Sequence, residues 1–366
     1  MTTTMKNLVF ILLIFIGLGA RAQTWSITGT VSDEKGETLP GATVFLANTK
    51  NGTATDGSGN FVLDKIPSAS YELVVNMMGY EPARQSIKIQ DKSVNVTIKL
   101  KVNSIQLKAV TINSAIDKNR ARYMRIFIAN FIGESVSAGE CRLLNPEVLN
   151  FHYEHGRDIL TASADEPLLV ENDMLGYKIK YLLKRFQYYD GFDVAGYDGD
   201  PYFEELKGTE EQQKQWENNR KLAYLGSCRH FFRAAMNNRT KAEGFDVALK
   251  TDDERHPLKP VIIDTMLKAV NNNYKALITK PVITRRDTTR RVLYITYIKT
   301  NPRQLTWIKQ FLDTVIIDKN GKLTPGMGVF AFHGQWATQR VAELTPLDYF
   351  VDPLLAEKMR FLYQKH

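Results

Sequence analysis

A series of short segments with alternating apolar and polar residues occupies the first third of the chain and constrains its fold most. Glycine-rich turns separate these segments. Alternation with a period of two indicates half-buried strands, because successive side chains point to opposite faces. Seven short strands in one such stretch predict an antiparallel all-β sandwich over residues 23–112. The expected strands cover residues 25–32, 42–48, 59–66, 70–80, 84–90, 94–100 and 106–112.

Two motifs in this stretch resemble a known family. The series G-x-V-x-D-x-x-G-x-x-L-P-G-A-x-V begins at Gly29, and G-T-x-T-D-x-x-G-x-F begins at Gly52. Together with Gly79-Tyr80, these motifs resemble the carboxypeptidase regulatory-like domain. That resemblance implies a transthyretin-like sandwich, which also forms the N-terminal extension of many TonB-dependent receptors of the Bacteroidetes. In that family the module is accessory, so it implies no catalytic residue here.

The first 22 residues have the features of a secretory signal peptide. Lys6 precedes an apolar run from Leu8 to Ala20, and Ala20-Arg21-Ala22 forms a small-x-small cleavage site. The run is short for a membrane span, although an uncleaved anchor is the alternative. No cysteine follows the run, which argues against lipoprotein attachment. The mature chain is therefore expected to begin near Gln23, outside the cytoplasm, with no transmembrane segment.

Residues 113–366 predict an α+β domain with antiparallel strands and several helices. An amphipathic helix is expected within residues 115–135, because Tyr123, Phe127 and Phe131 share one face. A meander of about five strands through residues 150–206 should follow, and then two helices. Thr209 with Gln212 forms a capping box for the first helix, and Ser227 can cap the second. Later strands are expected at 244–250, 274–279, 292–299, 305–311 and 314–323, with a tight turn at Asn320-Gly321 and a last helix over 352–364.

This second region also resembles a segment that follows the same module in exported Bacteroidetes proteins of unassigned function. The resemblance implies no activity. The similarity to the receptors themselves ends here, because no long series of barrel strands with aromatic girdles follows the module. The residues that carry the second resemblance are 120–135, 144–149, 168–183 and 223–234.

The sequence lacks the metal-binding motifs of zinc peptidases. A zinc carboxypeptidase needs a His-x-x-Glu pair and a distant histidine, and no His-x-x-Glu or His-Glu-x-x-His occurs among the six histidines. His152 and Glu154 should share one face of a strand, which is more typical of a solvated face than of a metal site. We therefore expect no metal and no cofactor.

Other candidate groups favour structural roles. Ser227 does not lie in a G-x-S-x-G elbow, and Cys228 and His230 would point apart on a helix. The acid pairs Glu171/Asp173 and Asp198/Asp200 could serve a glycosidase but are more typical of turns. Cys141 and Cys228 are expected as separate buried thiols, and export leaves a disulfide open as the alternative.

The densest cluster of like charges is a basic segment between two expected strands. It contains Arg285, Arg286, Arg290 and Arg291. A solvated hairpin tip is the ordinary interpretation, and contact with anionic lipid headgroups or lipopolysaccharide is the functional one. Trp307 and Trp336 could stack on a sugar, although core packing is the more usual role of tryptophan. The net charge of +8 is spread thinly and identifies no partner.

Together these features predict an exported, non-enzymatic binding or cell-envelope scaffold protein. Its expected location is the periplasm or the periphery of the outer membrane, or outside the cell. The expected partners are an envelope protein, a glycan or an anionic lipid surface; nucleic acid is excluded by export. The alternative is an exported hydrolase or carbohydrate-binding accessory protein acting on glycan or peptide.

Overall fold

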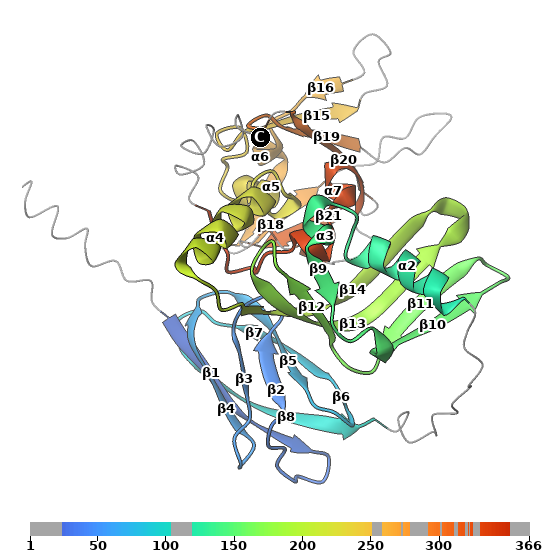
Figure 1. Cartoon of the computed structure of the whole chain (residues 1–366). Coiled ribbons are helices and arrows are strands. Elements are labelled where there is room, and N and C mark those ends of the chain that lie inside the picture. The colour runs from blue at the N-terminus through green and yellow to red at the C-terminus, as the bar shows by residue number, and fades with distance from the viewer. Residues whose placement is uncertain are drawn as a thin grey trace, which may run out of the picture. The chain divides into compact units, whose positions relative to one another are not determined.

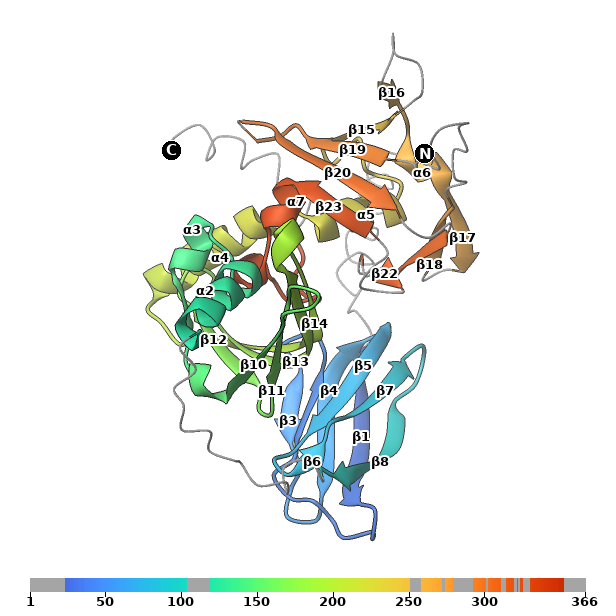
Figure 2. The ribbon, with the colours of Figure 1, turned by 90° about the vertical axis from the view of Figure 1, so that its right-hand side faces the viewer.

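A computed structural model of the chain divides into two compact units, residues 1–45 with 51–107 and residues 46–50 with 108–366. Each unit is shown in Figures 1 and 2. The structure describes residues 24–103, 119–250, 258–271, 274–278, 292–300, 302–310, 314–318, 321, 323–324 and 330–351. The expected strand at 106–112 and the expected last helix at 352–364 lie outside these residues.

The first unit is a sandwich of two four-stranded sheets. One sheet has the order β4-β1-β8-β6 and the other the order β3-β2-β5-β7. Side chains from both inner faces form its core, for example Ile27, Phe61 and Leu73. The strands are β1 (Thr24–Asp33), β2 (Thr43–Leu46), β3 (Gly52–Ala54), β4 (Asn60–Pro67), β5 (Ser70–Asn76), β6 (Tyr80–Glu81), β7 (Ala83–Lys88) and β8 (Val94–Val102).

The predicted sandwich is confirmed, but its strands are not all antiparallel. β1 and β8 run parallel, with Gly29 opposite Val96. Strand direction depends on how the chain crosses between the two sheets, and the period-two pattern does not contain that information. The tight pairing explains Gly29, because a Cβ there would lie 2.2 Å from the carbonyl oxygen of Val96.

The second unit begins with α2 (Arg120–Phe131), which lies against a six-stranded antiparallel sheet (Figure 2). Tyr123, Phe127 and Phe131 are buried in its core, as their spacing predicts. The helix ends at Phe131, and Gly133, two residues later, has a φ of +116° that few other residues adopt. This part contains α3 (Val136–Gly139), η1 (Pro146–Val148), η2 (Asp190–Phe192), β9 (Cys141–Leu143), β10 (Leu149–Glu154), β11 (Ile159–Ala164), β12 (Leu168–Asn172), β13 (Tyr177–Tyr189) and β14 (Val194–Glu205).

The expected sequential meander is wrong in its pairing order. β13 is thirteen residues long, and β12 pairs with its first part while β11 pairs with its last part. β14 pairs along the opposite edge of β13. β14 also begins at Val194, earlier than the predicted 202, because pairing with β13 orders a stretch whose glycines and aspartates are typical of a loop.

The remainder of the second unit combines two longer helices, α4 and α5, and shorter ones with two further sheets of orders β16-β15-β19-β20-β23 and β17-β18-β21-β22. The capping box of Thr209 and Gln212 and the Ser227 cap are both confirmed. Gly321, between antiparallel β21 and β22, has a φ of +78°, and its N–H donates to the Asp318 carbonyl at 2.9 Å, as the predicted tight turn requires. Asn320 lies outside the described residues. The elements are α4 (Glu210–Tyr224), α5 (Cys228–Met236), α6 (Ile263–Met266), α7 (Gln335–Thr338), η3 (Val341–Glu343), β15 (Phe245–Lys250), β16 (Leu258–Pro260), β17 (Leu267–Asn271), β18 (Tyr274–Ile278), β19 (Val292–Tyr297), β20 (Gln304–Gln310), β21 (Thr314–Asp318), β22 (Leu323–Thr324) and β23 (Phe330–Gly334).

None of the helices within the described ranges is long and apolar enough to cross a membrane.

Candidate functional site

The basic segment with Arg285, Arg286, Arg290 and Arg291 lies outside the described residues. The strands on either side of it are described. β18 pairs with β17 and β21, whereas β19 pairs with β15 and β20 in a different sheet. The expectation of a hairpin is therefore wrong, since the flanking strands do not pair with each other. The segment connects two sheets, and long-range pairing of this kind leaves no mark in the local pattern.

Basic side chains lie beside both acid pairs. Arg142 binds both Glu171 and Asp173, at 2.5 and 2.8 Å. Asp200 is buried and pairs with Lys184 at 2.7 Å. Each of the two acid pairs thus includes at least one carboxylate that forms an ion pair with a basic side chain. Ion pairs of this kind are typical of a structural role.

Metal-ligating side chains do not gather within the described ranges, where no group of three His, Cys, Asp or Glu could hold an ion. His152 and Glu154 are both exposed on one face of β10, as the alternation predicts. Glu154 pairs with Arg157 at 3.4 Å, and His155 packs edge-on against the ring of Tyr153. This is the solvated strand face that the sequence favours.

Both cysteines are free thiols, so the alternative of a disulfide between Cys141 and Cys228 is not what the structure shows. Burial raises the pKa of each thiol to about 12. A nucleophilic cysteine needs a depressed pKa, because the thiolate is the reactive form. Neither thiol therefore has the lowered pKa that a nucleophilic cysteine needs.

The one buried histidine of the α5 region is held by two hydrogen bonds. The ring of His230 is 3% exposed. Its Nδ1 accepts from the Gly226 N–H at 3.0 Å, and its Nε2 lies 3.1 Å from Oε2 of Glu243. Because a backbone N–H only donates, Nδ1 must be unprotonated and Nε2–H must donate to the carboxylate. Burial lowers the pKa of His230, and the Glu243 carboxylate partly opposes that shift.

This arrangement predicts a pH-dependent stability. A histidine whose folded pKa lies below its unfolded value stabilises the fold above pH 6.5 and loses that contribution as the pH falls. We expect the free energy of unfolding, measured with urea, to decrease from pH 7 to pH 5. His230→Gln should flatten this dependence, whereas His152→Gln, at an exposed position, should keep it. An unchanged pH dependence in His230→Gln would contradict this assignment.

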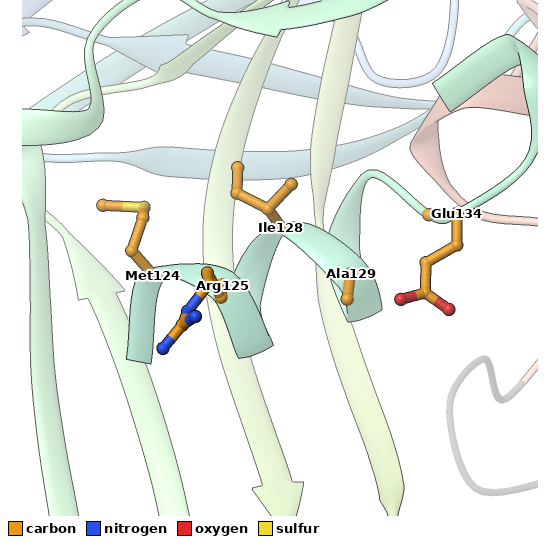
Figure 3. A pocket seen from close by; sticks show the side chains of 6 residues that line it. Met124, Arg125, Ile128, Ala129 and Glu134 are labelled. Atoms are coloured by element: carbon orange, nitrogen blue, oxygen red, sulfur yellow. The ribbon is translucent and has the colours of Figure 1, made fainter. Parts of the chain in front are cut away.

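A groove of about 400 Å³ lies along α2, and Figure 3 shows the side chains that line it. Met124, Ile128 and Ala129 give it an apolar floor, and Arg125 and Glu134 supply opposite charges near it. Its residues come from α2 and the turn that ends it. The groove can accept an apolar side chain of a partner, and Glu134 is the one carboxylate among its lining residues.

The two tryptophans considered for sugar stacking differ in their surroundings. Trp336 is buried, and its Nε1–H donates to the carbonyl oxygen of Gly226 at 2.7 Å. Core packing is therefore its role. Trp307 is half-buried on β20, and its sequence neighbours Thr306 and Ile308 are buried on the opposite face of the strand. The ring of Trp307 stacks on the rings of Tyr294 and His333. The sequence indicated Trp307 but not its two aromatic neighbours, which only the strand register brings together.

Comparisons with known proteins identify the first unit. Residues 27–112 match the family model of the CarboxypepD_reg-like domain. TonB-dependent receptor P3 of Formosa agariphila is 30% identical over 109 residues, which are 30% of this chain and 10% of the receptor. TonB-dependent receptor SusC of Bacteroides thetaiotaomicron is 36% identical over 86 residues, 24% of this chain and 8% of the receptor. The chain thus matches about a tenth of the length of these relatives.

Similarity to solved structures is weak. A 3-chlorocatechol 1,2-dioxygenase from Rhodococcus opacus aligns over 22% of this chain and 61% of its own, with 12% identity and a TM-score of 0.20. An alignment at that score supports no statement about function. By motif, by family model and by its sandwich fold, the stretch from residue 27 to residue 112 is a CarboxypepD_reg-like domain, similar to a part of TonB-dependent receptors.

Proposed function

We propose that this protein is exported and acts as a non-enzymatic binding or scaffold protein of the cell envelope. The observation that carries the proposal is the CarboxypepD_reg-like domain at residues 27–112, which the chain shares with TonB-dependent receptors. The signal-peptide features of residues 1–22 agree with it. In this scheme residues 23–112 form the accessory module and residues 113–366 the part that binds a partner.

The basic segment is proposed as a contact with an anionic surface. Arg285, Arg286, Arg290 and Arg291 place four positive charges within seven residues. A basic residue near an anionic membrane surface contributes about 1 kcal/mol to binding, and salt weakens this attraction. The second candidate, a carbohydrate-binding accessory protein, is favoured by one observation, the aromatic row on β19, β20 and β23.

Cell fractionation tests the proposal. In a Bacteroidetes host, the tagged protein should be recovered with the envelope and should begin near Gln23. Salt should release it, because the screening length shrinks from about 8 Å at physiological ionic strength to about 3 Å at 1 M. Replacing Arg285, Arg286, Arg290 and Arg291 by Ser should allow release at lower salt.

A matched control changes the net charge equally at dispersed sites. The exposed lysines Lys35, Lys88, Lys92 and Lys99 of the first unit serve for this when replaced by Ser. If the control is released as easily as the arginine variant, the basic segment is not the contact. Recovery of the full-length protein in the cytosol would refute export itself.

A further inference from the structure

Three aromatic rings form a continuous row across the outer face of the sheet β16-β15-β19-β20-β23. Tyr294 lies opposite Trp307, and Trp307 lies opposite His333, in directly paired positions of β19, β20 and β23. The ring centroids are 6.2 and 5.5 Å apart, and the ring planes differ by only 20° and 6°. His333 is exposed, and the other two rings are half-buried.

The side chains on the opposite face of the same sheet show which face packs on the core. Leu293, Ile295 and Ile308 point the other way and are buried in the core around α5. Phe231 of α5 and Trp336 of α7 belong to that same core, so both helices pack on the inner face. The exposed Asp246 and His333 lie on the other face. Polar residues usually cover such a solvent-facing side, so a row of aromatic rings there calls for an explanation.

The next position in the row leaves one ring accessible. Ala248 of β15 lies opposite Tyr294, and Pro260 of β16 lies opposite Ala248. The methyl group of Ala248 is too small to cover the phenol ring of Tyr294. The side of this ring that faces away from Trp307 is therefore accessible, with the apolar Ala248 next to it. In the adjacent row, Asp246 lies opposite Thr296 on the same face, and Asp246 is exposed.

We infer that this surface binds a neutral oligosaccharide, with a sugar ring stacked on Tyr294 above Ala248 and sugar hydroxyls hydrogen-bonded to Asp246 and Thr296. This specifies the ligand of the proposed binding function and rests on it. The electrostatics are complementary, because the face of an aromatic ring is negative and the C–H groups of a sugar ring are weakly positive. Asp246 accepts hydrogen bonds from hydroxyls and repels phosphate, which disfavours lipid headgroups and nucleic acid.

Isothermal titration of the purified mature protein tests the inference, with maltohexaose, cellohexaose and xylohexaose as separate probes. We expect saturable binding of at least one of them, insensitive to added salt because the ligand is uncharged. Trp307→Ala and Tyr294→Ala should each weaken it about tenfold or more, as aromatic anchors do in other interfaces. Tyr294→Phe keeps the ring and should bind within about twofold of the unchanged protein. Val270→Ala, at a 55% exposed position of β17, is the control and should bind normally.

Unfolding by urea shows whether each variant is folded, so that lost binding can be assigned to the lost ring. The inference is wrong if no probe binds, or if binding survives both alanine variants. Salt-sensitive binding of an oligolysine peptide without sugar binding would mean that the surface takes a basic protein segment instead. Export is tested separately: a cytosolic protein that binds sugar refutes only the proposed location, and an envelope protein that binds none refutes only this inference.

Discussion

Replacing Arg220 by Met should lower the free energy of unfolding of the second unit by about 3 kcal/mol, because several charge-assisted hydrogen bonds are lost together. Arg220 is 5% exposed. Its Nε donates to the Leu175 carbonyl at 2.7 Å and its Nη2 to the Gly176 carbonyl at 3.1 Å. It also lies 4.0 Å from the centroid of the Tyr177 ring, and a desolvated cation–π contact contributes about 2 kcal/mol.

The hydrogen bonds of Arg220 are part of a larger contact between α4 and the turn before β13. Trp216 donates to the Asp173 carbonyl at 2.8 Å, and Asn219 donates to the Met174 carbonyl at 2.7 Å. Three side chains spaced along one face of α4 therefore bind four successive carbonyls of residues 173–176. The turn fits this face closely, because Gly176 has a φ of +67° and a Cβ there would lie 2.2 Å from the ring of Trp216.

Urea unfolding of Arg220→Met beside Lys214→Met measures the effect. Lys214 lies on the same helix but is exposed, so its replacement should change the stability by less than about 0.5 kcal/mol. Arg220→Lys keeps the charge but cannot hold two carbonyls in a fork, so an intermediate loss is expected. Equal stability of the two Met variants would show that α4 is not fixed to the sheet through Arg220.

Local signals predicted the second unit well where a few neighbouring residues decide the structure. The capping box at Thr209, the cap at Ser227 and the turn at Gly321 each depend on hydrogen bonds or dihedral angles within four residues. The helix from Arg120 to Phe131 was predictable because its aromatic residues recur every four positions. In these cases the residues of one short segment determine its local structure.

Pairing between distant strands was not predictable in the same way. β1 and β8 run parallel, and β11 and β12 share one edge of β13, although each strand was recognised by its alternation. Alternation indicates which side chains share a face but not which strand lies beside it. The local pattern therefore predicts a hairpin around the basic segment, although its flanking strands belong to different sheets. For the same reason, the sequence indicates Trp307 alone, and only the register of three strands brings Tyr294 and His333 beside it.

Phe127→Ala should destabilise the second unit more than any other change considered, by about 3 to 5 kcal/mol. Phe127 is 0% exposed, and its ring centroid lies 4.8 Å from that of Phe131 and 4.7 Å from that of Phe186. Removing the ring loses the free energy gained by burying its carbons. It also leaves a cavity between α2 and the sheet, which can close only in part. The large loss is expected because the ring of Phe127 packs between Phe131 of α2 and Phe186 of β13.

Two further variants separate packing from helix propensity. Phe127→Leu retains an apolar side chain of moderate size and should cost less than about 1.5 kcal/mol. Arg125→Ala changes an exposed residue of the same helix and should change the stability by less than about 0.5 kcal/mol. Urea unfolding of the three variants gives the comparison. If Phe127→Ala unfolds within about 1 kcal/mol of the unchanged protein, α2 does not depend on this core for its position, because a fully buried ring cannot be removed from a packed core at so small a cost.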